Sequence, residues 1–223
     1  MSNTFTSESV CAGHPDKICD QVSDAVLDEV FKVDKYSRVA VETMVTKNFM
    51  AMAGEVTTKA KLNYKKIAQK IINNLGYNIP KLNFSEKSEI IVKIHTQSPE
   101  IAVGVDNLGA GDQGMMFGYA CSETKELMPL PIMLAHRLAM GIDKLREAKR
   151  LPYLRPDGKT QVTVGYEKDI PKTIETVVLA VPHEEKIKLY RVKEDLYNKL
   201  VTPVLQEYGY KINRNQLIVT WTG

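Results

Sequence analysis

Apolar residues recur at helical spacing near the start of the chain, and two apolar runs follow them. Ile18, Val22, Val26 and Val30 share one stripe, which predicts a helix over residues 17–32. Residues 39–45 and 49–56 are joined by the polar Thr46-Lys47-Asn48, which predicts a β-hairpin. The pattern then predicts a helix over 58–75, capped by Gly76, and a strand over 89–94.

The second half of the chain repeats this order. Residues 161–166 and 173–181 predict a second hairpin, residues 183–208 a long helix that begins at His183, and residues 216–221 a strand. Gly209-Tyr210 follows this helix as Gly76-Tyr77 follows the earlier one. We interpret the pattern as a duplicated strand-strand-helix-strand unit. It predicts an α+β fold of mainly antiparallel or mixed sheets, each covered by helices on one face.

A glycine-rich segment separates the two halves. Gly104, Gly109, Gly111 and Gly114 make residues 97–116 either a linker or a mobile active-site loop. A further helix is predicted over 129–150. The expected division is an N-terminal α+β domain at 1–96, the glycine-rich segment at 97–116 and a central α+β domain at 117–223.

Composition narrows the class of protein. The 223 residues carry a formal net charge of +3 with both signs interspersed, so we expect neither a nucleic-acid partner nor a membrane surface. No apolar stretch is long enough to span a bilayer, and no N-terminal signal region is evident. The three cysteines show neither a CxxC pair nor metal spacing, which fits a reducing compartment, and we expect a cytoplasmic protein.

The string Gly13-His14-Pro15-Asp16-Lys17 places an imidazole, a carboxylate and an ammonium at the start of the first predicted helix. Unpaired backbone N–H groups and the helix dipole favour phosphate there. His14 and Lys17 can meet phosphate oxygens while Asp16 holds a hard cation. The alternative is that Asp16 only caps the helix and His14 is an ordinary loop residue.

Other charged positions also have two interpretations. Glu42 and Glu55 lie in the first hairpin, where they either face solvent or bind a cation or the ammonium of a small substrate. Asp112 either hydrogen-bonds a nucleoside or caps a turn. Pro156-Asp157-Gly158 is a strong turn signal, and the following Lys159 can reach a phosphate. We expect His95 and His183 to be solvated or satisfied.

Taken together, these strings resemble the S-adenosylmethionine synthetase family. The resemblance rests on six segments in the same order, at residues 5–28, 41–43, 54–58, 97–106, 109–120 and 154–163. It implies condensation of ATP with L-methionine to S-adenosylmethionine, with release of phosphate and diphosphate. A thioether sulfur is nucleophilic when neutral, so the reaction needs alignment and charge neutralisation rather than a general base.

The resemblance also implies residue roles. His14 and Lys159 are implied as catalytic, and ATP contacts are implied for His14, Lys17, Asp112, Asp157, Gly158 and Lys159. Methionine contacts are implied for Glu55 and Gln97. Asp16 is implied as a Mg²⁺ ligand and Glu42 as a K⁺ ligand. The segment from Gln97 to about residue 107 resembles a gating loop, although it is shorter than expected.

The family's C-terminal part has no counterpart in this sequence, and the match weakens around His183 and residues 219–223. His14, Lys17 and Lys159 are few cations for a triphosphate, so we expect little activity from this chain alone. It is either one subunit of a split enzyme, completed by a complementary C-terminal-type chain, or a truncated remnant. A non-catalytic nucleotide-binding or regulatory subunit is the alternative function, and a purely structural subunit is a third. We expect a homo- or hetero-oligomer.

Overall fold

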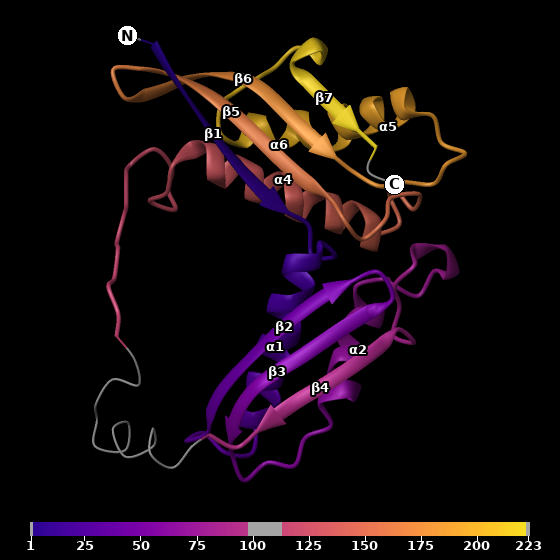
Figure 1. The fold of residues 1–223 in the computed structure, drawn as a ribbon. Helices are drawn as coiled ribbons and strands as arrows, with labels where there is room; N and C mark the ends of the chain where they lie inside the picture. The colour runs from indigo at the N-terminus through magenta and orange to yellow at the C-terminus, as the bar shows by residue number, and fades with distance from the viewer. Residues whose placement is uncertain (1, 98–112, 222–223) are drawn as a thin grey trace. The chain divides into compact units, whose positions relative to one another are not determined.

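The computed structural model describes residues 2–97 and 113–221. Contacts divide the chain into two compact units, which we describe separately. One comprises Pro15–Gly118, and the other combines Met1–His14 with Tyr119–Gly223. Each unit is a sheet with helices on one face, as Figure 1 shows.

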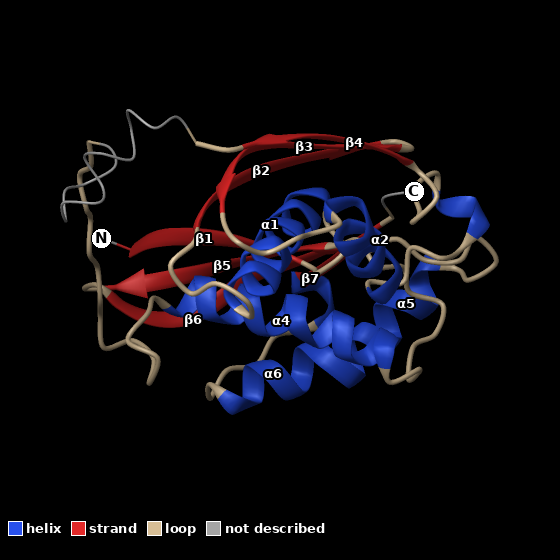
Figure 2. Ribbon diagram, turned by 90° about the horizontal axis from the view of Figure 1, so that it is seen from below, coloured by secondary structure: helices blue, strands red, loops and turns tan. Residues whose placement is uncertain are grey.

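The unit of Pro15–Gly118 has a three-stranded mixed sheet in the order β2-β3-β4. β2 runs antiparallel to β3, and β3 parallel to β4. The helices α1 and α2 lie together on one face of this sheet (Figure 2). Its elements are α1 (Pro15–Phe31), β2 (Arg38–Thr46), β3 (Phe49–Thr57), α2 (Tyr64–Asn74), a 3₁₀ turn (Pro80–Leu82) and β4 (Glu89–His95).

The second unit has a four-stranded sheet in the order β1-β5-β6-β7. β5 is antiparallel to both β1 and β6, and β7 is parallel to β6. Its elements are β1 (Ser2–Val10), α4 (Leu130–Glu147), β5 (Lys159–Glu167), β6 (Ile170–Ala180), α5 (Leu189–Leu196), a π-turn (Tyr197–Val201), α6 (Thr202–Glu207), a 3₁₀ turn (Arg214–Gln216) and β7 (Leu217–Thr220).

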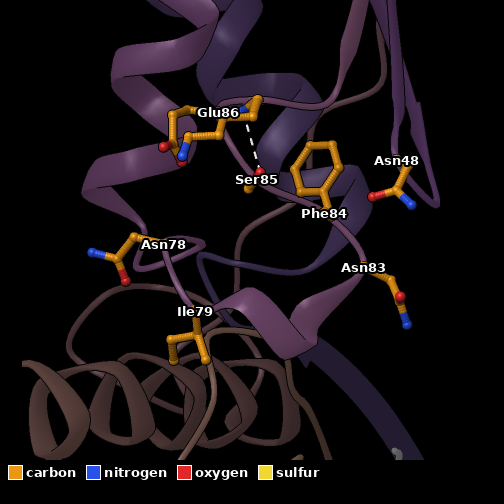
Figure 3. Close-up of a pocket in the computed structure, with 8 residues that line it drawn as sticks. Asn48, Asn78, Ile79, Asn83, Phe84, Ser85 and Glu86 are labelled. Carbon is orange, nitrogen blue, oxygen red and sulfur yellow. Dashed lines mark hydrogen bonds between the residues drawn. The ribbon is translucent and has the colours of Figure 1, made fainter.

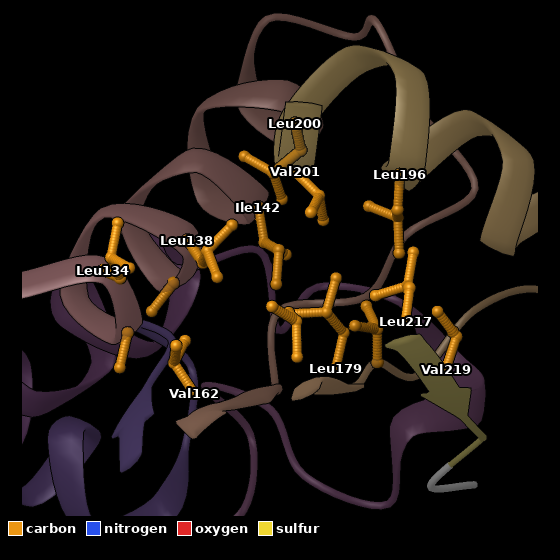
Figure 4. Close-up of a cluster of buried hydrophobic side chains, with 14 of the residues drawn as sticks. Leu134, Leu138, Ile142, Val162, Leu179, Leu196, Leu200, Val201, Leu217 and Val219 are labelled. Atoms are coloured by element: carbon orange, nitrogen blue, oxygen red, sulfur yellow. The ribbon is translucent and has the colours of Figure 1, made fainter. Parts of the chain in front are cut away.

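The core of this second unit lies between α4, the sheet and the C-terminal helical segment (Figure 4). Its leucine, isoleucine and valine side chains are almost fully buried, and each buried side chain of this size contributes about 1.5–3 kcal/mol. This packing fixes α4 against the strands that carry the site. The labelled members are Leu134, Leu138, Ile142, Val162, Leu179, Leu196, Leu200, Val201, Leu217 and Val219.

The predicted α+β fold and the repeat are confirmed. In each unit an antiparallel hairpin is followed by a helical segment and a strand parallel to the second hairpin strand. Gly76 and Gly209 follow the two helical segments with φ of 93° and 82°, a conformation in which glycine has no steric penalty.

Three elements differ from the prediction. The predicted helix over 58–75 begins only at Tyr64, where the Asn63 side chain caps it by accepting the N–H of Lys66. β1 was not predicted, because Ser2–Val10 is rich in serine and threonine and has few aliphatic residues, yet it pairs with β5 along its whole length. The predicted helix over 183–208 begins only at Leu189. His183 precedes it in an isolated bridge with Leu154 and is 7% exposed, since the chain first runs back along residues 153–155.

The pairing of β1 affects the organisation of the chain. The division expected at residues 1–96, 97–116 and 117–223 follows chain order, whereas the contacts group Met1–His14 with the residues from Tyr119 onward. Residues 98–112, which hold most of the expected gating loop, lie outside the described residues.

Candidate functional site

Two loops meet at one end of the β1–β5 pair. β1 ends at Val10 and β5 begins at Lys159, and these two residues are register partners. Beyond them the backbone N–H of Cys11 donates to the carbonyl of Gly158 at 2.9 Å. The N–H of Gly13 donates to the carbonyl of Pro156 at 3.2 Å. We call residues 11–14 and 156–158 the paired loops.

Gly13 is required by how closely the paired loops approach. A Cβ placed on Gly13 would lie 2.5 Å from both Cβ and the carbonyl oxygen of Pro156. Real Cβ atoms do not tolerate such distances, so any side chain here would push the loops apart. The pairing therefore depends on glycine at this position.

The paired loops bring an imidazole and a carboxylate together beside a lysine. His14 is 8% exposed. Burial raises the pKa of the Asp157 carboxyl, while the Gly158 N–H, His14 and Lys159 act in the opposite direction. The Asp157 carboxylate accepts the Gly158 N–H at 2.6 Å. The Asp157 carboxylate can accept hydrogen bonds from hydroxyl groups, and the His14 and Lys159 side chains can donate to phosphates. The three groups together suit a ligand that has both hydroxyls and phosphates.

The raised pKa of Asp157 predicts a pH dependence of stability. Folding makes this carboxyl bind its proton more tightly, so its contribution to stability falls as pH rises from the ordinary pKa of 3.8 through the raised value. Asp157→Asn removes the charge and keeps an acceptor for Gly158. We expect the variant to be more stable than the parent at neutral pH and to lose this advantage near pH 3, as measured by urea unfolding. A gain that does not change with pH would contradict this.

Asp16 and Lys17 occupy the first turn of α1, as the sequence predicted for a helix start. Asp16 is exposed, and Lys17 Nζ lies 3.4 Å from Asp20 Oδ2. His14 is the last residue of one unit, and Pro15 is the first residue of the other. The short motif therefore spans the point where the chain passes between the units.

Glu42 and Glu55 lie on the face of the β2-β3-β4 sheet that the helices leave uncovered. Glu42 is exposed in phase with Ala40 and Met44, whereas Val41 is buried. Glu55 pairs in register with Ala40 and with His95. His95 Nε2 lies 3.5 Å from Glu55 Oε1, so this histidine is solvated and partnered, as expected.

Gln97 is the last described residue before the gap. Its Oε1 is buried and accepts no hydrogen bond from the described part of the chain. A buried acceptor without a donor is costly, so this atom is suited to a ligand that can donate. Asp112 lies outside the described residues.

The predicted site residues thus fall into two groups. His14, Asp157, Gly158 and Lys159 are gathered in one unit, and Asp16, Lys17, Glu42, Glu55 and Gln97 belong to the other. Within residues 2–97 and 113–221 the structure shows no cluster of three or more metal-ligating side chains. No helix among these residues is long and apolar enough to cross a membrane.

Two of the cavities among the described residues lie away from the predicted site residues. One of about 310 Å³ is lined by amide and polar side chains, among them Asn48, Asn78, Asn83 and Glu86 (Figure 3). Another of about 760 Å³ lies in the second unit and is lined by Phe5, Tyr119, Glu123 and Tyr166 among others. Neither cavity is lined by a predicted site residue.

Comparison with known proteins identifies the class first. The family model of the S-adenosylmethionine synthetase N-terminal domain matches residues 2–99. The model of the central domain of the same enzymes matches residues 107–223. These two matches define an S-adenosylmethionine synthetase-like protein.

The relatives agree. S-adenosylmethionine synthase of Prochlorococcus marinus (strain MIT 9301) is 45% identical over 243 residues, covering 98% of this chain and 59% of the relative. The synthases of Leifsonia xyli subsp. xyli (strain CTCB07) and Pseudothermotoga lettingae are each 45% identical over 98% of this chain. The chain belongs to the S-adenosylmethionine synthetase family. It spans about 59% of the length of the curated relatives it matches.

Proposed function

We propose that this chain is a subunit of a cytoplasmic methionine adenosyltransferase, which forms S-adenosylmethionine, phosphate and diphosphate from ATP and L-methionine. The observation that carries the proposal is the loop pairing, which places His14 and Asp157 together beside Lys159. The relatives, named S-adenosylmethionine synthases, support the choice of reaction.

The catalytic roles follow from charge. The methionine sulfur forms a bond to C5′ of ATP as the C5′–O bond to the triphosphate breaks, and water then hydrolyses the triphosphate to phosphate and diphosphate. The sulfur needs no base, so the protein must align the two atoms and stabilise the negative charge that builds on the triphosphate. His14 and Lys159 meet that charge, and Lys17 adds a further cation. Asp157 and the backbone of Gly158 hold the nucleoside, with Asp112 as a proposed further contact.

Methionine is proposed to bind through the other group of residues. The Glu55 carboxylate suits the amino acid's ammonium group, and its side chain is 35% exposed beside His95. Gln97 Oε1 supplies the buried acceptor that has no donor within the described chain. An ammonium group satisfies both acceptors with charge-assisted hydrogen bonds.

Magnesium and potassium are proposed as the metals. Mg²⁺ is commonly held by one or two carboxylates together with substrate phosphates, so the single exposed Asp16 at a helix start fits a site that ATP completes. Glu42 is the proposed K⁺ ligand, and its exposed carboxylate leaves room for ligands from elsewhere. When bound, Mg²⁺ neutralises phosphate charge; the alignment of sulfur and carbon remains the protein's task.

A complementary chain is part of the proposal. His14, Lys17 and Lys159 are a small cationic set for a triphosphate, and the relatives contain much sequence beyond the matched part. The uncovered face of β2-β3-β4, with Met44 60% and Ile91 38% exposed, is the surface that we propose is buried in an oligomer.

The test is reconstitution. The chain is mixed with a polypeptide homologous to the part of the relatives that this chain does not match. We expect the mixture to form S-adenosylmethionine from ATP and methionine in the presence of Mg²⁺ and K⁺, as detected by mass spectrometry. His14→Ala and Asp16→Ala should each reduce the rate at least about 100-fold, because each removes a group from the charge-stabilising set. Full activity of both variants would support a structural subunit instead. Nucleotide binding by calorimetry without product would support a non-catalytic binding subunit.

A further inference from the structure

Asp143 connects α4 to the loop that carries His14. Its Oδ2 accepts a hydrogen bond from the backbone N–H of Ala12 at 2.8 Å, two residues before His14. The Asp143 side chain is 13% exposed. The loop at residues 11–14 is therefore held both by the backbone of residues 156–158 and by a side chain from α4.

α4 is also tied to both strands that lead into the paired loops. Ser9 Oγ on β1 lies 2.8 Å from His136 Nδ1 on α4. Thr160 Oγ1 on β5 donates to the carbonyl of Ala135 at 2.8 Å. With Leu134, Leu138 and Ile142 buried in the core, α4 is a fixed support rather than a mobile one.

Burying a carboxylate at this position costs free energy, because the charge is removed from water. Burial raises the pKa of Asp143, and the Ala12 N–H and Arg146 lower it, so the charge is stabilised mainly by these two groups. Arg146 NH2 lies 3.7 Å from Asp143 Oδ1 and is itself only 12% exposed. Aliphatic side chains would pack at less cost, whereas a carboxylate fixes the direction of a backbone N–H.

We infer that Asp143 is a positioning residue for the nucleotide-binding end of the site: its carboxylate, which lies near Arg146, accepts the Ala12 N–H and so keeps His14 beside Asp157. The inference rests on the proposed function for the role of His14. It concerns a residue that touches no substrate and acts through the backbone of the loop.

Three variants and one control test this in the complete assembly. Asp143→Ala removes the acceptor, Asp143→Asn keeps an acceptor without charge, and Asp143→Glu places the carboxylate one methylene further from the backbone. Glu147→Gln is the matched control, because Glu147 is an acid on the same helix that also lies near Arg146, at 3.4 Å, but is largely exposed. Amide hydrogen exchange of residues 11–14 and binding of a non-hydrolysable ATP analogue are measured for each.

We expect Asp143→Ala to speed exchange of the 11–14 amides by about 10- to 100-fold, with the strand amides of β5 unchanged. Analogue affinity should fall about tenfold or more, Asp143→Asn should recover much of both losses, and Glu147→Gln should match the parent. Unchanged exchange in Asp143→Ala, or an equal effect in Glu147→Gln, would overturn the inference. If the parent binds no nucleotide but Asp143→Ala still speeds exchange of the loop amides, the proposed function is refuted. The role of Asp143 in holding the loop at residues 11–14 would then remain supported.

Discussion

Replacing Gly13 by alanine should separate the paired loops and weaken nucleotide binding. The added Cβ would lie 2.5 Å from the Pro156 carbonyl oxygen, which is backbone and cannot rotate away. We expect the free energy of unfolding to fall by about 1–3 kcal/mol, as for other overpacked sites. Affinity for Mg²⁺-ATP should fall by more than about tenfold, because His14 moves away from Asp157. Denaturant unfolding and calorimetry on the same samples measure both quantities.

Gly118→Ala is the control for this experiment. A Cβ on Gly118 meets nothing within 4 Å, so the same chemical change should alter neither stability nor binding appreciably. Parental nucleotide affinity in Gly13→Ala would show that the loop pairing has no part in the site. An equal loss in both variants would point to a general effect of losing glycine.

The second large effect is expected from Lys159→Gln. Lys159 is the first residue of β5 and lies beside Asp157, so its ammonium is available to a phosphate at the paired loops. Loss of one charge-stabilising group should lower kcat/KM of the reconstituted enzyme by about 10²–10³. The methionine concentration needed for half-saturation should be the same as in the parent, because this residue is proposed to act only on the phosphates.

Lys172→Gln provides the comparison, since Lys172 is an exposed lysine on β6 of the same unit. It should retain the parental kcat/KM. Similar losses in both variants would indicate a dependence on total charge, and no loss in Lys159→Gln would exclude this residue from the phosphate site.

The spacing of apolar residues was sufficient to predict helices and strands whose buried residues follow a regular pattern. The helix starting near Lys17 was predicted from its apolar stripe, and the hairpin at residues 39–56 from two apolar runs joined by polar residues. β1 was missed since its side chains are largely hydroxylated, and its stability comes from a full ladder of backbone hydrogen bonds with β5. That pairing is between residues more than 140 positions apart, which a local pattern does not reveal.

Local sequence patterns also did not reveal how the residues of the site come together. The motif around His14 and the turn around Asp157 were each recognised, but their proximity follows from the β1–β5 register and from two backbone hydrogen bonds. Asp143 gave no signal at all, because its partner is the N–H of Ala12, and any residue except proline supplies an N–H. The role of His183 was also hidden, since bridging to Leu154 depends on the return of the chain after β6.

The position of β1 has a consequence for synthesis on the ribosome. Ser2–Val10 is translated well before its partner Lys159–Glu167, which emerges only after roughly 150 further residues. All residues of the β2-β3-β4 sheet are synthesised before then, while β1 still lacks its partner strand. The paired loops, where we propose that nucleotide binds, can therefore form only after residues 156–167 have left the exit tunnel.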